Sequence, residues 1–366
     1  MNYNWQQNNW PNFEFDETVI DNLSMELALE LGEIKGLINS LSREVQQETT
    51  LQIMISEAIQ TSAIEGEYFS RQDIMSSIKK NLGISDNLLK IKDKNAQAIS
   101  KLMVEVRNSN SKLLSENTLK KWHKILMEYS STIKAGYYRI SEEPMQIVSG
   151  TFGKQIVHFE APPSKIINQE MKQFINWYQN FKVKESEIKK ALIKTAIAHL
   201  YFETIHPFED GNGRIGRAIA EKCFSECLKR PVLLSISSTI EQNKKQYYQS
   251  LKNAQRSLEI TDWIIYFSKI LLHSHKSTKQ IIQFTLQKAI FLDTYRNVLN
   301  ERQHKAILKM IETGISGFEG GITSKKYVSI NKTSRATATR DLQDLFEKQI
   351  LKQKGEGRNV SYDLNF

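Results

Sequence analysis

Residues 206–217, HPFEDGNGRIGR, place groups that can act on a phosphate within twelve consecutive positions. His206 can take up a proton near neutral pH, so it is the candidate general base. Asp210 offers the hard carboxylate oxygen that Mg²⁺ prefers, usually beside phosphate oxygens. Arg214 and Arg217 can chelate a polyphosphate through their planar guanidinium groups. The segment therefore predicts a site for phosphoryl or nucleotidyl transfer.

Two predicted helices must hold this segment in place. Residues 189–205 repeat apolar side chains every three or four positions, which predicts a helix that Pro207 ends. The Gly-Asn-Gly turn at 211–213 allows positive φ and a close approach of the backbone to a ligand. A second helix starts within this turn, so its free backbone N–H groups form an anion-binding concavity. Arg214 and Arg217 lie three positions apart on that helix and share one face.

Other interpretations of the same residues are weaker. Gly211, Gly213 and Gly216 satisfy G-x-G-x-x-G, but a helix precedes them where a dinucleotide-binding fold needs a strand. A glycine turn with a surface network of arginine and aspartate would explain some of the pattern, although it would not need every group at once. His199 lies two helical turns before His206, and we expect a packed helix histidine there rather than a metal ligand.

The segment resembles the signature of the Fic family, H-x-F-x-[D/E]-G-N-G-R-x-x-R, at every position. The resemblance covers roughly residues 115–270 and implies a mainly α-helical core. It also implies a protein adenylyltransferase, which moves AMP from ATP to a Ser, Thr or Tyr hydroxyl of a target protein or of itself. By the same resemblance, His206 deprotonates the target hydroxyl, Phe208 anchors the loop, Asp210 holds Mg²⁺, Asn212 with the amides of Gly211 and Gly213 steadies the α-phosphate, and Arg214 and Arg217 hold the β- and γ-phosphates.

Two further parts of the family pattern have counterparts in this sequence. The pieces MQIVS and QIVHF around GTFGK predict a β-hairpin, which matches the flap that clamps the target segment by strand addition. The flap residues expected to bind the target are Ile147, Val148, Ser149, Gly150, Ile156 and Val157. The residues expected in the adenine pocket are Tyr247, Tyr248 and Gln255.

The segment TSAIEGE, residues 61–67, places an acid at the end of a predicted helix over about 50–66. A helix C-terminus disfavours negative charge by a few tenths of a kcal/mol up to about 1 kcal/mol, which an exposed glutamate tolerates. Thr61, Glu65 and Gly66 also resemble the inhibitory motif [S/T]-x-x-x-E-[G/N] of Fic proteins. This resemblance implies that Glu65 pairs with Arg217 and keeps the γ-phosphate from its productive position.

The rest of the chain suggests three parts: an N-terminal helical domain over 1–110, a Fic core over 111–285 and a winged-helix domain over 286–366. The start, WQQNNWPNFEFD, resembles the N-terminal domain of a large group of bacterial Fic proteins, and its aromatic rings are expected to dock on the body. Apolar periodicity predicts one helix from Glu17 to Val45 and a second over 50–65. The predicted fold is therefore a mainly α Fic-type helical bundle with a β-hairpin flap and a C-terminal winged helix.

The net charge of +9 and the pI of about 9.2 favour an anionic partner. Residues 286–366 hold 14 Lys and Arg against 9 Asp and Glu, so much of the excess lies there. The winged helix could bind DNA through Arg335, Arg340, Lys325 and Lys326, with the Fic core as a nucleotide sensor. It could equally serve protein contacts or a homodimer. Two cysteines, no signal peptide and no membrane-spanning run predict a cytoplasmic protein without a membrane partner.

The sequence leaves the reaction itself partly open. Removal of AMP, or transfer of another nucleotide, would use the same motif. The target protein is not identified by any of these residues. The expected ligands are ATP and Mg²⁺.

Overall fold

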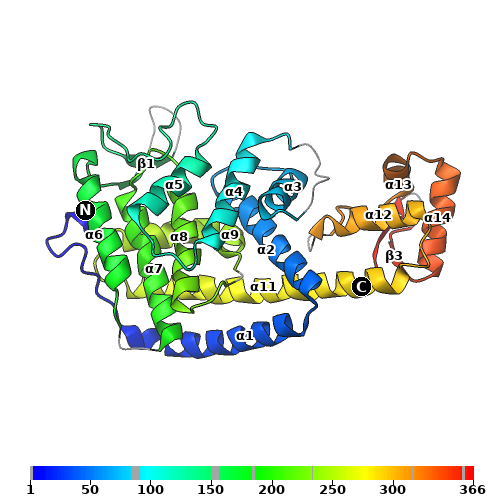
Figure 1. The fold of residues 1–366 in the computed structure, drawn as a ribbon, viewed down its shortest axis with the longest axis horizontal. Coiled ribbons are helices and arrows are strands. Elements are labelled where there is room, and N and C mark those ends of the chain that lie inside the picture. The colour runs from blue at the N-terminus through cyan, green and yellow to red at the C-terminus, as the bar shows by residue number, and fades with distance from the viewer. Residues whose placement is uncertain are drawn as a thin grey trace. The chain divides into compact units, whose positions relative to one another are not determined.

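The computed structural model describes residues 3–84, 91–149, 156–183, 186–232, 234–314, 317–356 and 359–366. It is mainly helical with two small antiparallel sheets, so the predicted fold class is confirmed (Figure 1). The helices are α1 Asp21–Ser40, α2 Arg43–Ile64, α3 Arg71–Leu82, α4 Lys94–Asn108, α5 Glu116–Leu126, α6 Ile167–Asn180, α7 Glu187–Ile205, α8 Asn212–Cys227, α9 Ile236–Gln242, α10 Lys244–Ala254, α11 Thr261–Tyr295, α12 Glu301–Ile311, α13 Ser324–Asn331 and α14 Arg335–Glu347. The strands are β1 Gln146–Ser149, β2 Ile156–Glu160, β3 Leu351–Lys354 and β4 Ser361–Leu364.

The chain forms two compact units. Residues 1–36 and 53–278 make up the first unit, and residues 37–52 and 279–366 make up the second. The three-part division expected from the sequence stays a prediction. No helix among the described residues has the length and apolar character needed to cross a membrane.

Helix α7 lies at the centre of the first unit. Nearly all of its side chains are buried, from Lys189 to Ile205. A helix that is apolar on most faces must be surrounded by others, and α7 packs along α8 and α6. The turn that joins α7 to α8 is therefore held between two buried helices, and this turn carries residues 206–211 (Figure 1).

The N-terminal aromatic residues dock on the first unit, as the sequence predicts. Trp5 donates its indole N–H to the carbonyl oxygen of Glu160 at 2.8 Å. Trp10 donates to the Glu170 carboxylate at 2.9 Å and packs edge-on against Tyr201, with ring centroids 5.0 Å apart. The arm thereby contacts β2 and the buried face of α6 and α7.

The predicted single helix from Glu17 to Val45 is wrong, because the chain breaks between α1 and α2 at Leu41. The side-chain amide of Gln46 donates to the carbonyl oxygens of Ile38, at 2.9 Å, and of Leu41, at 3.1 Å. These bonds add to the backbone hydrogen bond that the Ile38 carbonyl oxygen accepts from the Leu41 N–H at 3.1 Å, and they stabilise the end of α1. The apolar period continues across the break because both helices bury one face, so periodicity alone does not reveal it.

The second unit contains the helices α12, α13 and α14 followed by the β3–β4 hairpin, which is the predicted order of elements. The two strands pair in antiparallel register, with Leu351 opposite Leu364. Ile322 adds a short bridge to Tyr362 through two backbone hydrogen bonds of 2.7 and 2.9 Å. The apolar core of the second unit includes Ile307 and Leu342. The identification of this unit as a winged helix stays a prediction.

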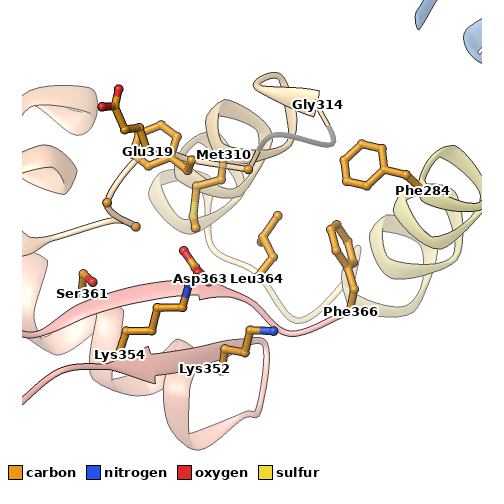
Figure 2. Close-up of a pocket in the computed structure, with 14 residues that line it drawn as sticks. Phe284, Met310, Gly314, Glu319, Lys352, Lys354, Ser361, Asp363, Leu364 and Phe366 are labelled. Atoms are coloured by element: carbon orange, nitrogen blue, oxygen red, sulfur yellow. Dashed lines mark ion pairs between the residues drawn. The ribbon is translucent and has the colours of Figure 1, made fainter. Parts of the chain in front are cut away.

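A cavity of about 440 Å³ lies in the second unit, beside the β3–β4 hairpin (Figure 2). Phe366 closes one side and packs edge-on against Phe284, with centroids 5.6 Å apart. Lys354 and Asp363 form an ion pair on its wall. The described residues that line it include no histidine, cysteine or arginine, so its lining lacks the imidazole and guanidinium groups that the 206–217 segment contains.

Candidate active site

His206 ends α7 in a left-handed conformation, with φ 50° and ψ 59°. Its backbone N–H donates to the carbonyl oxygen of Phe202 at 3.0 Å. This conformation costs a residue other than glycine about 1 kcal/mol, so surrounding contacts must hold it. The side chain is 14% exposed and opens into a cavity of about 600 Å³.

Arg139 supplies those contacts. The guanidinium is buried and donates from Nε to the His206 carbonyl oxygen at 2.8 Å. Its Nη2 donates to the carbonyl oxygens of Ile205, at 3.3 Å, and Pro162, at 2.5 Å. The Arg139 backbone N–H also donates to the carbonyl oxygen of Pro207 at 2.9 Å. Sequence reasoning missed this residue, which lies 67 positions before His206.

The Asn212 side chain closes the loop on itself. It accepts from the Phe208 N–H at 2.9 Å and donates to the Phe208 carbonyl oxygen at 2.8 Å. Phe208 is fully buried and stacks on His123, with centroids 3.9 Å apart. His123 accepts from the Gly136 N–H at Nδ1, so Nε2 carries the hydrogen that points to the Asp210 carbonyl oxygen at 3.2 Å. Phe208 thus lies where an anchor is expected, while the Asn212 amide shapes the turn.

The glycines at 211 and 213 leave room that no other residue would leave. Gly211 has φ +80°, and a Cβ there would lie 2.5 Å from the Met127 side chain. A Cβ on Gly213 would lie 2.4 Å from a carboxylate oxygen of Glu65 and 3.1 Å from Arg217. The first turn of α8 therefore presents bare backbone, whose N–H groups have no partner within the helix. In this structure the Glu65 carboxylate lies directly against that backbone.

The cavity gathers most of the residues that the sequence nominated. These lining residues are Glu65, Ile147, Val148, His206, Asp210, Gly211, Asn212, Gly213, Arg217, Tyr247, Tyr248 and Gln255. Tyr247 and Gln255 are buried, and Tyr248 is partly exposed. Thr61, Gly66, Arg214 and Val157 are not among the lining residues.

The flap hairpin forms as predicted, with β1 and β2 antiparallel and Ser149 opposite Ile156. Val148 and Val157 are both exposed. Gly150 lies outside the described residues. Of these two exposed side chains, Val148 lines the cavity, next to the partly buried Ile147.

Arg217 is almost fully buried, and its guanidinium is held by the end of α2. Its Nη2 donates to a carboxylate oxygen of Glu65 at 2.8 Å and to the Thr61 carbonyl oxygen at 2.9 Å. Its Nε donates to the Thr61 hydroxyl at 2.8 Å. Burial raises the pKa of Glu65, but the charge and hydrogen bond of Arg217 outweigh it and lower this pKa. The predicted inhibitory residues Thr61 and Glu65 therefore both contact the second arginine of the segment.

Glu67, two residues after Glu65, forms an ion pair with Arg214, the first arginine of the segment. Arg214 Nη1 lies 2.6 Å from a carboxylate oxygen of Glu67, while Nη2 lies 3.6 Å from Asp210. The Arg214 side chain is 7% exposed. Sequence reasoning missed Glu67, although it is the second acid in the quoted segment TSAIEGE. Both arginines of α8 are thus paired with acids that follow α2.

The protonation states suit proton transfer from a hydroxyl. Burial, and then the charge of Arg139, lower the pKa of His206 to about 4, so its imidazole is neutral at pH 7. Burial raises the pKa of the Glu203 carboxyl to about 8, so it is protonated at pH 7. The two side chains approach to 3.9 Å. Sequence reasoning also missed Glu203, which lies on α7 one turn before His206.

His199 packs inside the helical core, as expected. Its Nε2 lies 2.8 Å from the Tyr247 hydroxyl, and burial lowers the pKa of His199 to about 4. The described residues contain no group of three or more His, Cys, Asp or Glu side chains arranged around a metal position. The side chain of Asp210 is 59% exposed at the cavity. One exposed carboxylate fits an Mg²⁺ ion whose other ligands are phosphate oxygens and water.

Comparisons with known proteins agree with this geometry. Residues 113–223 match the Fic/DOC family, and residues 3–84 match a domain of unknown function (DUF4172). A probable protein adenylyltransferase of Aquifex aeolicus is 32% identical over 97 residues, which are 26% of this chain and 27% of that protein. The chain thus matches about a quarter of the length of this relative.

Solved structures share the fold at low sequence identity. A Fic family protein from Desulfovibrio desulfuricans has a TM-score of 0.57 and 19% identity, covering 97% of this chain and 98% of that one. A Fic-1 structure from C. elegans has a TM-score of 0.53 and 17% identity, covering 74% of each chain.

The helical bundle, the glycine turn that opens α8 and the histidine that ends α7 define a protein of the Fic fold with a cavity at that turn. Residues 113–223 of this chain form a Fic/DOC-family domain.

Proposed function

We propose that this chain is a protein adenylyltransferase that moves AMP from ATP to a Ser, Thr or Tyr hydroxyl of a target protein and of itself. One observation carries the proposal: a neutral His206 faces the same cavity as the bare first turn of α8 and Arg217. The relative from Aquifex aeolicus, named as a probable protein adenylyltransferase, supports the same reaction.

The reaction would use groups that line the cavity, together with Arg214 beside it. His206 takes the proton of the target hydroxyl, and the oxygen forms a bond to the α-phosphorus of ATP. The bond between that phosphorus and the α,β-bridging oxygen breaks, and pyrophosphate leaves. The backbone N–H of Gly213, and that of Gly211 once it is released from Asp210 Oδ1, would stabilise charge on the α-phosphate, while Arg214 and Arg217 bind the departing phosphates. Tyr247, Tyr248 and Gln255 would surround the adenine.

Asp210 would hold Mg²⁺, with phosphate oxygens and water as the other ligands. A bound Mg²⁺ would neutralise charge on the phosphates. The chain's own contribution is to present the Asp210 carboxylate, which its bonds within the loop hold at the cavity: Oδ1 accepts from the Gly211 N–H at 2.6 Å.

The target segment would add to the flap. The exposed apolar residues of the flap, Val148 and Val157, lie on a two-stranded sheet, and a third strand can pair with such an edge. Ile147 and Val148 also line the cavity, so a strand bound there would pass close to His206.

The enzyme as folded is restrained by Glu65. Its carboxylate lies against the backbone at Gly213 and forms an ion pair with Arg217, which a γ-phosphate would otherwise contact. The pair between Arg217 and Glu65 must break before ATP can bind productively, so it functions as a switch. Gly66, at φ +84°, ends α2 directly after this acid.

Labelled ATP tests the proposal. We expect Glu65→Gly to raise self-modification from α-phosphate-labelled ATP by at least tenfold, and His206→Ala in that background to abolish it. His273→Ala, at an exposed histidine, is the matched control and should leave labelling unchanged. If both site variants label like the wild type, the proposed reaction is wrong.

Removal of AMP and use of another nucleotide remain alternative reactions for the same site. Mass spectrometry of the Glu65→Gly protein after incubation with mixed nucleotides separates them. A mass increase of one AMP identifies adenylyl transfer and locates the modified residue, whereas another increment identifies another nucleotide.

DNA binding by the second unit is a second candidate, and the pairing of two acids on α14 within this unit favours it. Asp341 is buried against Arg302 and Tyr327, and the carboxylate of Asp344 accepts hydrogen bonds from Gln303 and Lys348. This leaves exposed positions of α14, Arg335 and Arg340 among them, free to meet phosphates. Lys325 and Lys326 would add to this surface.

A mobility shift of the full chain with duplex DNA tests this candidate. Affinity should fall steeply between about 50 and 200 mM salt, because bound counterions are released. Arg340→Ala should weaken binding, and an unaltered shift would remove this candidate. The homodimer expected from the sequence stays a prediction, as does the cytoplasmic location.

A further inference from the structure

Arg139 joins two segments that the proposed reaction must keep in register. On one side it donates to the carbonyl oxygens of Ile205 and His206, at the end of α7. On the other side it donates to the Pro162 carbonyl oxygen at 2.5 Å and the Ser164 hydroxyl at 2.9 Å. Residues 162–164 follow directly on β2, the second strand of the flap. One guanidinium therefore connects the exit of the flap to the catalytic histidine.

All four of these acceptors are neutral. The guanidinium is 3% exposed, and burial lowers the pKa of Arg139 to about 10, which leaves it charged at pH 7. A cation at the C-terminal end of a helix is favourable, since the last carbonyls carry partial negative charge. Because no carboxylate among the described residues bonds to this guanidinium, its charge also acts on His206.

One backbone carbonyl and two carboxylates around His206 act in the opposite direction. The carbonyl oxygen of Glu203 accepts from the imidazole at 3.4 Å, and the carboxylates of Glu65 and Asp210 favour protonation of the ring. Glu203 comes from α7, Glu65 from the end of α2 and Asp210 from the loop before α8. Arg139 is the positive group that opposes them.

We propose that Arg139 is a positioning residue that fixes His206 relative to the flap and keeps its imidazole free to accept the target proton. The inference rests on the proposed adenylyl transfer. The flap holds the target segment, so the spacing between flap and His206 sets whether the target hydroxyl reaches the imidazole. Misplacement of a reacting group by about 1 Å can cost on the order of 100-fold in rate.

Two substitutions separate geometry from charge. Arg139→Lys keeps a cation but cannot reach four acceptors, and Arg139→Met keeps a long apolar stem without charge. Both are made in the full-length Glu65→Gly protein. We expect kcat for self-modification to fall at least tenfold in both, with KM for ATP within about twofold of the parent, since Arg139 contacts no ATP-binding residue. A structural role alone would instead lower kcat, ATP affinity and thermal stability together.

The titration of His206 supplies a readout that does not depend on the reaction. In metal-free protein with labelled histidine, assigned with His206→Ala, we expect Arg139→Met to raise the titration midpoint of His206 by at least half a pH unit. Arg139→Lys should leave it near the parent value. If Arg139→Met leaves both the midpoint and kcat unchanged, the proposal is overturned.

The failure of the proposed function is distinguishable from the failure of this inference. If the Glu65→Gly parent transfers no AMP, the reaction is wrong, while the histidine titration still tests Arg139. If both Arg139 variants fail to fold, Ser164→Ala removes a single bond to the guanidinium. We expect this variant to lower kcat severalfold with unchanged KM for ATP. An unchanged kcat in Ser164→Ala would overturn the connection to the flap.

Discussion

Each arginine of α8 that would bind phosphate is held by its own acid. Arg217 pairs with Glu65 at 2.8 Å, and Arg214 pairs with Glu67 at 2.6 Å. The two acids are separated by one glycine and leave α2 in the same turn. Two carboxylates thus take the positions next to the arginines that two phosphates would take. At the scale of single residues, we therefore expect the proposed restraint of this cavity to be shared between two ion pairs of different burial.

Glu67→Gln should remove the ion pair that Glu67 forms with Arg214. In the Glu65→Gly background we expect this substitution to lower the Kd for ATP a further twofold to fivefold, because a partly exposed ion pair contributes about 0.2–1 kcal/mol. Titration with a fluorescent ATP analogue measures it. Glu209→Gln, one residue before Asp210, is the control for loss of a nearby acid that pairs with neither arginine. An unchanged Kd in Glu67→Gln would show that the ion pair does not oppose ATP.

The position of Glu65, the acid proposed to inhibit, depends on how α2 is docked. Glu57, two turns before Glu65 on α2, is buried and accepts from the backbone N–H of Ser237 at 3.0 Å and from its hydroxyl. Ser56 lies 3.1 Å from the hydroxyl of Ser238. The carboxylate of Glu57, on α2, thereby accepts a hydrogen bond from a backbone N–H in the first turn of α9 and caps that helix. At the scale of elements, the position of Glu65 depends on the contact between Glu57 and α9 as well as on the ion pair between Glu65 and Arg217.

Glu57→Ala should weaken the docking of α2 without any substitution at Glu65 itself. We expect faster amide exchange along the last turns of α2 and a severalfold rise in self-modification from labelled ATP. The physical reason is that the start of α9 loses its cap and α2 loses a buried contact. Gln60→Ala, on the same helix, is the control. Wild-type exchange in Glu57→Ala would contradict a role of this anchor in restraint.

The first unit holds several ionisable side chains in their neutral forms. Burial lowers the pKa of four histidines, to about 4 for His123, His199 and His206 and to about 3 for His275. Burial also raises the pKa of Glu203 and Glu221 to about 8. At the scale of the whole molecule, these groups make stability depend on pH in two opposing ways.

The free energy of unfolding should pass through a maximum near pH 6.5. Below about 6.5 the unfolded chain binds more protons at the four histidines, so stability falls as pH falls toward 4. The two glutamates are protonated only in the folded state between about 4.5 and 8, so their contribution is lost as pH rises to 8. Four histidines outweigh two glutamates below pH 6.5, and only the glutamates act above it. Urea unfolding at pH 5, 6.5 and 8 measures this, and a steady rise from 6.5 to 8 would contradict it.

Much of the fold was predictable from local patterns. The apolar period located most helices of the first unit, and glycines with alternating residues located both hairpins. The break between α1 and α2 was not predictable, because the Gln46 side chain that caps it leaves no mark in the apolar period. Local order follows from neighbouring residues, whereas the end of a helix can depend on a side chain from the next one.

The sequence by itself determined the chemistry proposed for residues 206–217, because twelve consecutive positions carry the proposed base, the proposed metal ligand, two glycines of the turn and two arginines. It also nominated Glu65, which the structure places on Arg217. Only the tertiary structure revealed Arg139 and Glu67, which lie 67 and 147 positions from their partners. It also decided which groups are charged, since the neutral state of His206 comes from burial and from Arg139. Burial and distant contacts arise only when helices pack, and no local pattern specifies them.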